Sequence, residues 1–126
     1  MGNGYGQRYA GFPELPAGRY KTNGMNTENR RFTDIIQGDK PVLVDFFTEW
    51  SGSCITMKSI LEELIKRVGN NAVILNIDVD KNPAMAAAYG VNGIPTLLLF
   101  RHGQVKWRRS GLVQASQLDQ LLEKYN

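Results

Sequence analysis

Residues 41–54, PVLVDFFTEWSGSC, decide the fold of this chain. The run from Val42 to Phe47 is apolar and contains β-branched residues, as is typical of a strand buried on both faces in a parallel sheet. A helical pattern follows, because apolar residues recur at i, i+3, i+4, i+7, i+8 and i+11 from Met57 to Val68, and Gly69 ends it. The stretch therefore predicts a strand, a short loop and a long amphipathic helix.

The segments on either side extend this pattern. Residues 72–77 predict a second buried strand, which completes a strand–helix–strand unit with a right-handed crossover. Asn82-Pro83 starts a short Ala-rich helix that ends at Gly90. Upstream, residues 32–36 predict a short helix that Gly38 stops.

The last third of the chain predicts a hairpin and a helix. Residues 96–100 and 105–109 read as antiparallel strands joined by a tight turn at His102-Gly103, where we expect His102 to be an exposed spacer. Ser116 and Asp119 resemble a capping box that opens a final amphipathic helix. The expected fold class is α/β, with a mixed sheet and helices on both faces.

The composition of the chain excludes several classes of function. The chain has 126 residues, a formal net charge of +3 and one cysteine, Cys54. A single cysteine excludes an internal disulfide framework and a cysteine-rich zinc site, and His102 has no companion ligands, so we expect no metal. The densest basic stretch, residues 101–109, reads as a solvated strand face rather than a nucleic-acid surface. No apolar run approaches the length of a membrane span.

Residues 1–24 differ from the rest of the chain. They are rich in glycine, with interleaved tyrosines and two prolines, and show neither helical nor strand periodicity. We interpret them as a flexible N-terminal arm, either a plain linker or an arm whose aromatic residues dock on the domain or on a partner. We expect residues 25–126 to form one domain. We expect a cytoplasmic protein, with export after removal of a signal as the alternative.

Trp50-Ser51-Gly52-Ser53-Cys54 carries the chemistry, because it follows a buried strand and opens the strongest helix. The free N–H groups and the dipole at a helix N-terminus stabilise an anion, so a thiol there has a lowered pKa and becomes a nucleophile. Two thiols spaced as C-x-x-C can close a disulfide within one turn. Here Ser51 takes the first position, and its hydroxyl neither ionises near neutral pH nor forms a disulfide.

Residues from about 27 to 126 resemble thioredoxin. The family reads Trp-Cys-Gly-Pro-Cys where this chain has residues 50–54, and three further motifs match: the strand at 42–46, residues 92–96 with the family's cis-proline, and Gly111. The resemblance implies a thioredoxin fold and protein thiol–disulfide exchange without a cofactor. This chain departs from the family pattern at Ser51, Ser53, Ile55, Ser59 and Asn76.

The resemblance also implies roles for single residues. Ser51 takes the place of the attacking cysteine, Cys54 is the resolving cysteine, one turn into the helix and poorly exposed, and Asp45 is a buried acid that transfers protons, or else is kept for hydrogen bonding alone. The Ile94-Pro95 bond is expected to be cis, so that an extended substrate pairs with the backbone before it. The remaining substrate-binding residues are Trp50, either a platform or a packed aromatic, with Gly52, Gly93 and Gly111.

Three functions follow from this pattern. The first is a thioredoxin, a protein thiol–disulfide oxidoreductase, in a redox-inactive form that lacks the nucleophilic cysteine. The second is a natural redox-inactive module that holds extended peptides. The third is a monothiol protein in which Cys54 forms a mixed disulfide with a partner or glutathione. The expected partners are disulfide-containing or extended proteins and a thioredoxin reductase, with no nucleic acid.

Overall fold

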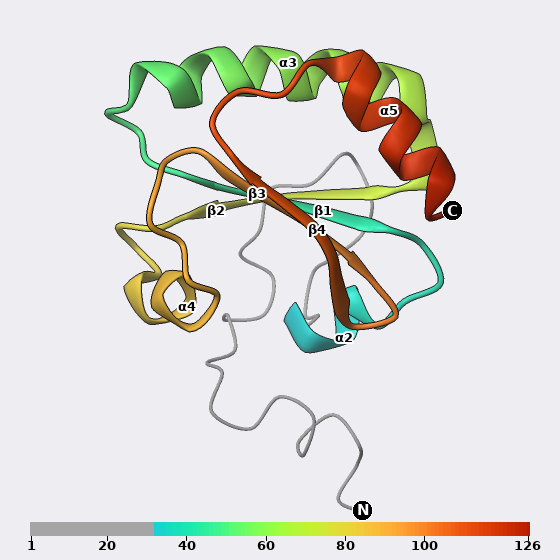
Figure 1. Cartoon of the computed structure of the whole chain (residues 1–126), viewed down its shortest axis with the longest axis horizontal. Coiled ribbons are helices and arrows are strands. Elements are labelled where there is room, and N and C mark those ends of the chain that lie inside the picture. Colours follow the sequence, from blue (N-terminus) through green and yellow to red (C-terminus); the bar gives the residue numbers. More distant parts are fainter. Residues whose placement is uncertain (1–31) are drawn as a thin grey trace, which may run out of the picture.

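The computed structural model describes residues 32–126, and the predicted arm at 1–24 lies outside them. The described part is a four-stranded sheet between two helical layers (Figure 1). In chain order the elements are α2 (Phe32–Ile36), β1 (Val42–Phe47), α3 (Gly52–Val68), the 3-10 turn η1 (Gly69–Asn71), β2 (Val73–Asp78), α4 (Pro83–Ala88), β3 (Thr96–Arg101), β4 (Gln104–Ser110) and α5 (Ala115–Lys124). Within residues 32–126 no helix is long and apolar enough to cross a membrane.

The strand order is β2-β1-β3-β4. Strand β1 pairs in parallel with β2 and antiparallel with β3, and β4 pairs antiparallel with β3 at one edge. This confirms the predicted mixed sheet and hairpin. His102 and Gly103 join β3 to β4 with φ of 51° and 79°, and two consecutive positive φ values suit the right-handed twist of a two-residue hairpin.

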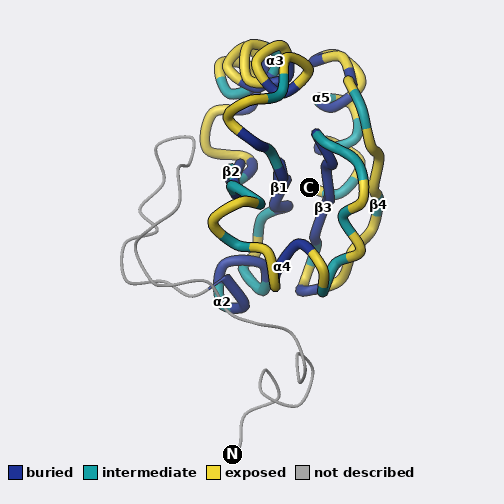
Figure 2. The backbone as a smooth tube through the Cα atoms, turned by 90° about the vertical axis from the view of Figure 1, so that its left-hand side faces the viewer, coloured by how far each residue is buried: buried dark blue, intermediate teal, exposed yellow. Residues whose placement is uncertain are grey.

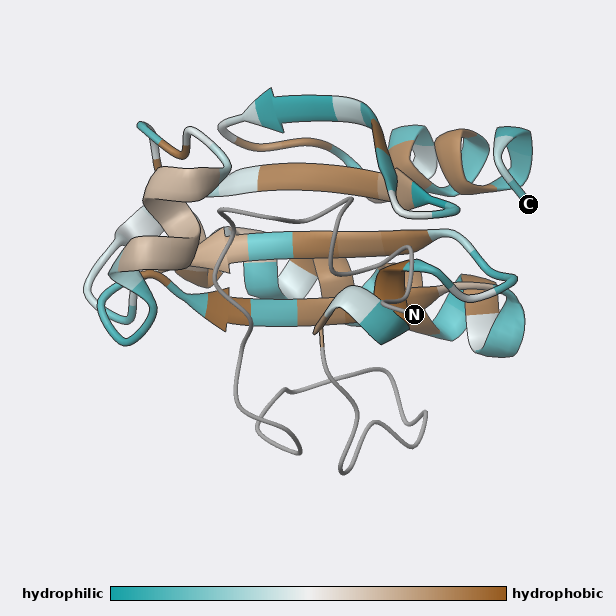
Figure 3. Ribbon diagram, turned by 90° about the horizontal axis from the view of Figure 1, so that it is seen from below, coloured by the Kyte–Doolittle hydropathy of each residue, from teal (hydrophilic) through white to brown (hydrophobic). Residues whose placement is uncertain are grey.

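The central strands are buried and the edge strand is not. Every residue of β1 and β3 is buried except the last of each, whereas β4 is exposed along almost its whole length (Figure 2). The same contrast appears in hydropathy, because hydrophilic β4 runs beside hydrophobic β3 (Figure 3). Successive side chains of the central strands β1 and β3 point to opposite faces, and they therefore pack into two separate cores, one on each face of the sheet.

Each face of the sheet packs against its own pair of helices. The α3/α5 face buries mainly leucines, including Leu43, Leu97 and Leu118. The α2/α4 face gathers aromatic rings: Phe32 and Phe100 meet edge-on at 5.6 Å between centroids, and Tyr89 meets Phe100 at the same distance. Both contacts have the edge-to-face geometry that aromatic pairs prefer.

One predicted helix start is wrong. Helix α5 begins at Ala115, with Gln114 as the residue before it, so Ser116 lies inside the first turn and no side chain caps the helix. Ala115 is itself buried, and in the chain it stands between Val113 and Leu118 of the α3/α5 core, so apolar packing rather than the capping residues explains the earlier start. At the other end of α5, Arg101 Nε donates to the carbonyl of Tyr125 at 2.6 Å.

Candidate functional site

Strand pairing brings the predicted site residues to one end of the sheet. Phe46 pairs with Thr96, and Thr96 pairs with Ser110. The same end of the sheet therefore carries the segment after β1, the segment before β3 and the segment after β4. Ser51, Cys54, Pro95 and Gly111 lie on those segments or just beyond them. The topology thus assembles at one place what the sequence spreads over sixty residues.

Ser51 is the N-cap residue of helix α3. It has extended backbone angles, and its Oγ accepts a hydrogen bond from the Cys54 N–H at 3.4 Å. A serine in this position satisfies one of the N–H groups that a helix start leaves without a partner. The hydroxyl that stands in the nucleophile's position therefore has a structural role as a helix cap.

Cys54 is the only cysteine of the chain and its side chain is buried, with 4% of its surface exposed. This confirms the predicted poor exposure. Its position differs from the prediction, because Cys54 is the third residue of α3 and lies in the first turn rather than beyond it. The thiol is therefore close to the positive end of the helix but shielded from solvent.

Asp45 is buried in β1, and 2% of its surface is exposed. Its alternation with Val44 and Phe46, which face α2 and α4, places it on the α3/α5 side of the sheet. Burial raises the pKa of Asp45 to about 7 from the usual 3.8. Among residues 32–126 the Asp45 Oδ1 has no hydrogen-bond partner. The residue that pairs with Asp45 on strand β2 is the uncharged Asn76. Asp45 can therefore take up or release a proton near neutral pH.

Trp50 stands in solvent, with 75% of its surface exposed. Its indole Nε1 donates to Asp80 Oδ2 at 3.1 Å, and the Asp80 N–H donates in turn to Asp78 Oδ1 at 2.9 Å. This exposure contradicts the reading of Trp50 as a packed aromatic. Sequence reasoning missed Asp80, because a carboxylate shortly after a strand gives no sign that it will meet a residue thirty positions away.

The segment before β3 is fixed to the end of β4. The Ile94-Pro95 bond is cis, as predicted. Thr96 Oγ1 donates to the Gly93 carbonyl and lies 3.0 Å from Ser110 Oγ, while the Gly111 N–H donates to the Pro95 carbonyl at 2.8 Å. Gly111 has a φ of 95°, which side chains rarely adopt, so glycine is required there.

Exposed apolar side chains lie at this end of the sheet. Three of the four large exposed hydrophobic side chains of residues 32–126 belong to Trp50, Ile55 and Leu112, which lie at or next to the predicted site segments. Gly52 is also exposed, at the first position of α3. Apolar side chains gathered at an exposed edge are typical of an interaction site.

The chain belongs to the thioredoxin family, since the family model Thioredoxin matches residues 23–124. It is 41% identical over 95 residues to a thioredoxin-like protein of Synechocystis, covering 75% of this chain and 90% of that protein. It is 37% identical to the thioredoxin of Acidithiobacillus ferridurans, covering 72% and 84%. Among solved structures, a thioredoxin variant of Halobacterium salinarum has a TM-score of 0.67 at 38% identity, covering 74% and 80%. The fold is thus the α/β thioredoxin fold.

Proposed function

We propose that this chain has the scaffold of a protein thiol–disulfide oxidoreductase but does not itself reduce disulfides. Such exchange begins when a thiolate attacks a disulfide sulfur, forms a mixed disulfide and expels the other sulfur as a thiolate. In this chain a serine hydroxyl takes the place of that thiolate, and it is bonded to the Cys54 N–H. The position of Ser51 at the start of α3 is the observation that carries the proposal.

The rest of the catalytic arrangement supports the same reaction class. After attack, a second thiolate must resolve the mixed disulfide, and a nearby group must accept its proton. Cys54 stands at the position of that second thiol, and Asp45, with its pKa near 7, matches the proton acceptor that the family resemblance implies. Only the first nucleophile is missing from the set.

The test is the reduction of insulin disulfides by dithiothreitol, followed as turbidity. We expect the chain to match the blank without protein, and Ser51→Cys to raise the rate well above it. Ser53→Cys, which adds a thiol one residue away, is the matched control and should stay at the blank. Turnover by the unmodified chain, or an inactive Ser51→Cys variant, would contradict the proposal.

A second function, binding of extended protein segments without turnover, is supported by contacts that do not involve Ser51. The hydrogen bond from Gly111 to Pro95 fixes the backbone, and the hydrogen bond from Trp50 to Asp80 fixes the indole ring. Neither bond depends on whether residue 51 is a serine or a cysteine. An extended segment could pair with the main chain at Ile94 and lay apolar side chains beside Trp50. Affinity should be modest, because such a contact is smaller than a standard stable interface.

Titration of the isotope-labelled chain with carboxymethylated insulin B chain, an unfolded probe without free thiols, tests this second function by NMR. We expect saturable amide shifts near Trp50, Ile94 and Gly111, and their loss in Trp50→Ala. Val105→Ala, which removes an exposed apolar side chain from strand β4, should bind normally. Shifts spread evenly over the surface would contradict a site at this end of the sheet.

A further inference from the structure

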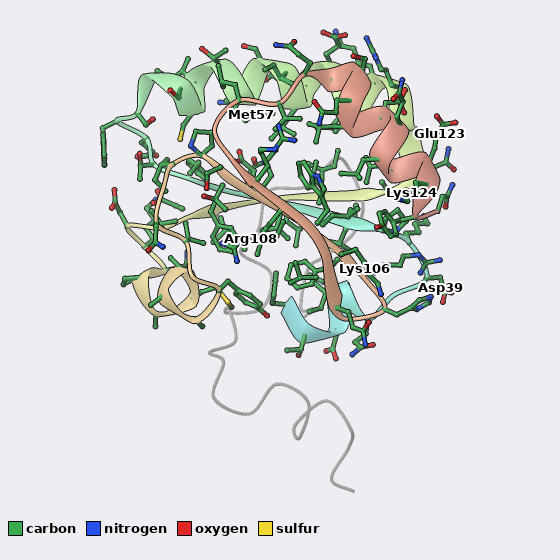
Figure 4. The ribbon with its side chains drawn as sticks, viewed as in Figure 1. Asp39, Met57, Lys106, Arg108, Glu123 and Lys124 are labelled. Atoms are coloured by element: carbon green, nitrogen blue, oxygen red, sulfur yellow. The ribbon has the colours of Figure 1, made fainter. Side chains whose placement is uncertain are left out.

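Arg108 reaches from the edge strand β4 to the end of α4. Its Nη1 donates to the Tyr89 carbonyl at 2.9 Å and its Nη2 donates to the Gly90 carbonyl at 3.0 Å. Figure 4 shows its side chain between β4 and α4, apart from Lys106, which lies farther along the strand. Carbonyls at a helix C-terminus have no partner within the helix, and a cation there is also favoured by the helix dipole.

These two carbonyls begin the segment that ends at Pro95. The far end of that segment is held by Ser110 and Gly111, through the bonds of Thr96 to Gly93 and of Gly111 to Pro95. Arg108 and Ser110 are two residues apart on β4, so their side chains share the α2/α4 face of the sheet. Strand β4 therefore holds the segment 89–95 at both of its ends.

The neighbouring basic residues do not make this contact. Lys106 Nζ donates to Gln104 on the same strand, and Arg109 lies over the Trp107 ring at 5.8 Å, on the opposite face from Arg108. Lys106 and Arg109 are the kind of solvated, charged side chains that keep an edge strand from pairing with other chains. Arg108 differs because its planar fork satisfies two successive backbone carbonyls, a geometry that a lysine cannot reproduce.

We propose that Arg108 is a positioning residue of the binding site. Arg108 fixes the start of the segment 89–95 and so sets where the Ile94 backbone lies relative to Trp50. Its effect on binding rests on the proposed function, whereas its effect on the segment does not. A polar side chain on the outer strand of the sheet thus controls a loop that carries no charge of its own.

Amide hydrogen exchange in the full chain tests the positioning. The N–H groups of Tyr89, Gly90 and Val91 bond to carbonyls of α4 and report its last turn. We expect Arg108→Met to speed their exchange by about tenfold or more while amides of α3 keep their rates, because loss of a charge-assisted bond frees the turn locally. Arg108→Lys, which offers one point charge, should fall between Arg108→Met and the unmodified chain.

Arg109→Met is the matched control, since it removes the same charge from the same strand on the other face. We expect it to leave exchange at Tyr89, Gly90 and Val91 within about twofold of the unmodified chain. Unchanged exchange in Arg108→Met, or an equal rise in Arg109→Met or across the whole molecule, would overturn the positioning role.

Insulin reduction in the Ser51→Cys background tests the link to binding. We expect Arg108→Met to raise KM by several fold with a smaller change in kcat, as when an interaction that positions substrate is lost. A fall in kcat at constant KM would overturn that link. If Ser51→Cys itself is inactive, the oxidoreductase proposal fails, and the exchange rates still decide whether Arg108 positions the segment.

Discussion

The two faces of the sheet bury different kinds of side chain. The α2/α4 face is closed by aromatic rings and aliphatic chains, with Phe32, Tyr89 and Phe100 in mutual contact. The α3/α5 face packs leucines but also carries Asp45 in β1 and the Cys54 thiol in α3. The comparison shows that the α2/α4 face stabilises the fold by apolar packing alone, whereas the α3/α5 face combines such packing with a buried carboxyl group that can exchange a proton.

The largest effect is expected on the aromatic face. Phe100→Ala removes a fully buried ring with two edge contacts, so we expect the free energy of unfolding to fall by about 3–5 kcal/mol. Urea denaturation at pH 5 and pH 8 should give the same loss, because neither Phe100 nor the rings that it contacts carry a carboxyl group or an imidazole. Val105→Ala, on the exposed strand β4, should cost far less. A loss that depends on pH would break the comparison between the faces.

Asp45 should make the other face sensitive to pH. The unfolded chain ionises Asp45 near pH 4, but the folded chain holds the proton up to about pH 7, so the free energy of unfolding should fall as pH rises through that window. The resulting loss in the free energy of unfolding is at most about 4 kcal/mol. This loss is complete above pH 7 and absent below pH 4.

Asp45→Asn isolates this effect. We expect the substitution to raise the free energy of unfolding at pH 8 by about 3 kcal/mol and to change it little at pH 4, as followed by urea denaturation. Glu62→Gln, which alters an exposed carboxylate of α3, is the control and should leave the pH profile unchanged. A flat profile for the unmodified chain would show that Asp45 ionises normally.

Cys54 should react slowly although it stands near the start of a helix. With 4% of its surface exposed, it must wait for a local opening, so we expect iodoacetamide to modify it on the order of a hundredfold more slowly than a cysteine peptide. Mass spectrometry of timed samples gives the rate, and urea should abolish the protection. Fast alkylation of the folded chain would instead favour the monothiol function.

The smallest effect concerns the helix cap. Ser51→Ala removes the acceptor of the Cys54 N–H, and we expect a loss of about 1 kcal/mol in the free energy of unfolding. Ser51→Asp keeps a capping oxygen and should retain the stability, while Ser53→Ala, which does not touch the cap, should be near neutral. Equal losses in Ser51→Ala and Ser53→Ala would argue against the capping role.

Much of the fold was predictable because its signals are local. The apolar run at 42–47 and the helical periodicity from Met57 to Val68 gave β1 and α3, and the His102-Gly103 turn gave the hairpin. The site was predictable only where a family motif was present. The contacts of Asp80 with Trp50 and of Arg108 with Tyr89 join residues 19–30 positions apart, and no local pattern encodes them. The start of α5 was missed because tertiary packing at Ala115 outweighed the capping residues.

The pairing of Ser51 with a lone Cys54 has an electrochemical consequence. A chain with one cysteine cannot store two electrons in a disulfide of its own, so it contains no intramolecular redox couple. Its net charge and the start of α3 should therefore be the same in a strongly reducing and in a mildly oxidising glutathione buffer. For the proposed binding of extended protein segments, this predicts an affinity that does not differ between the two buffers.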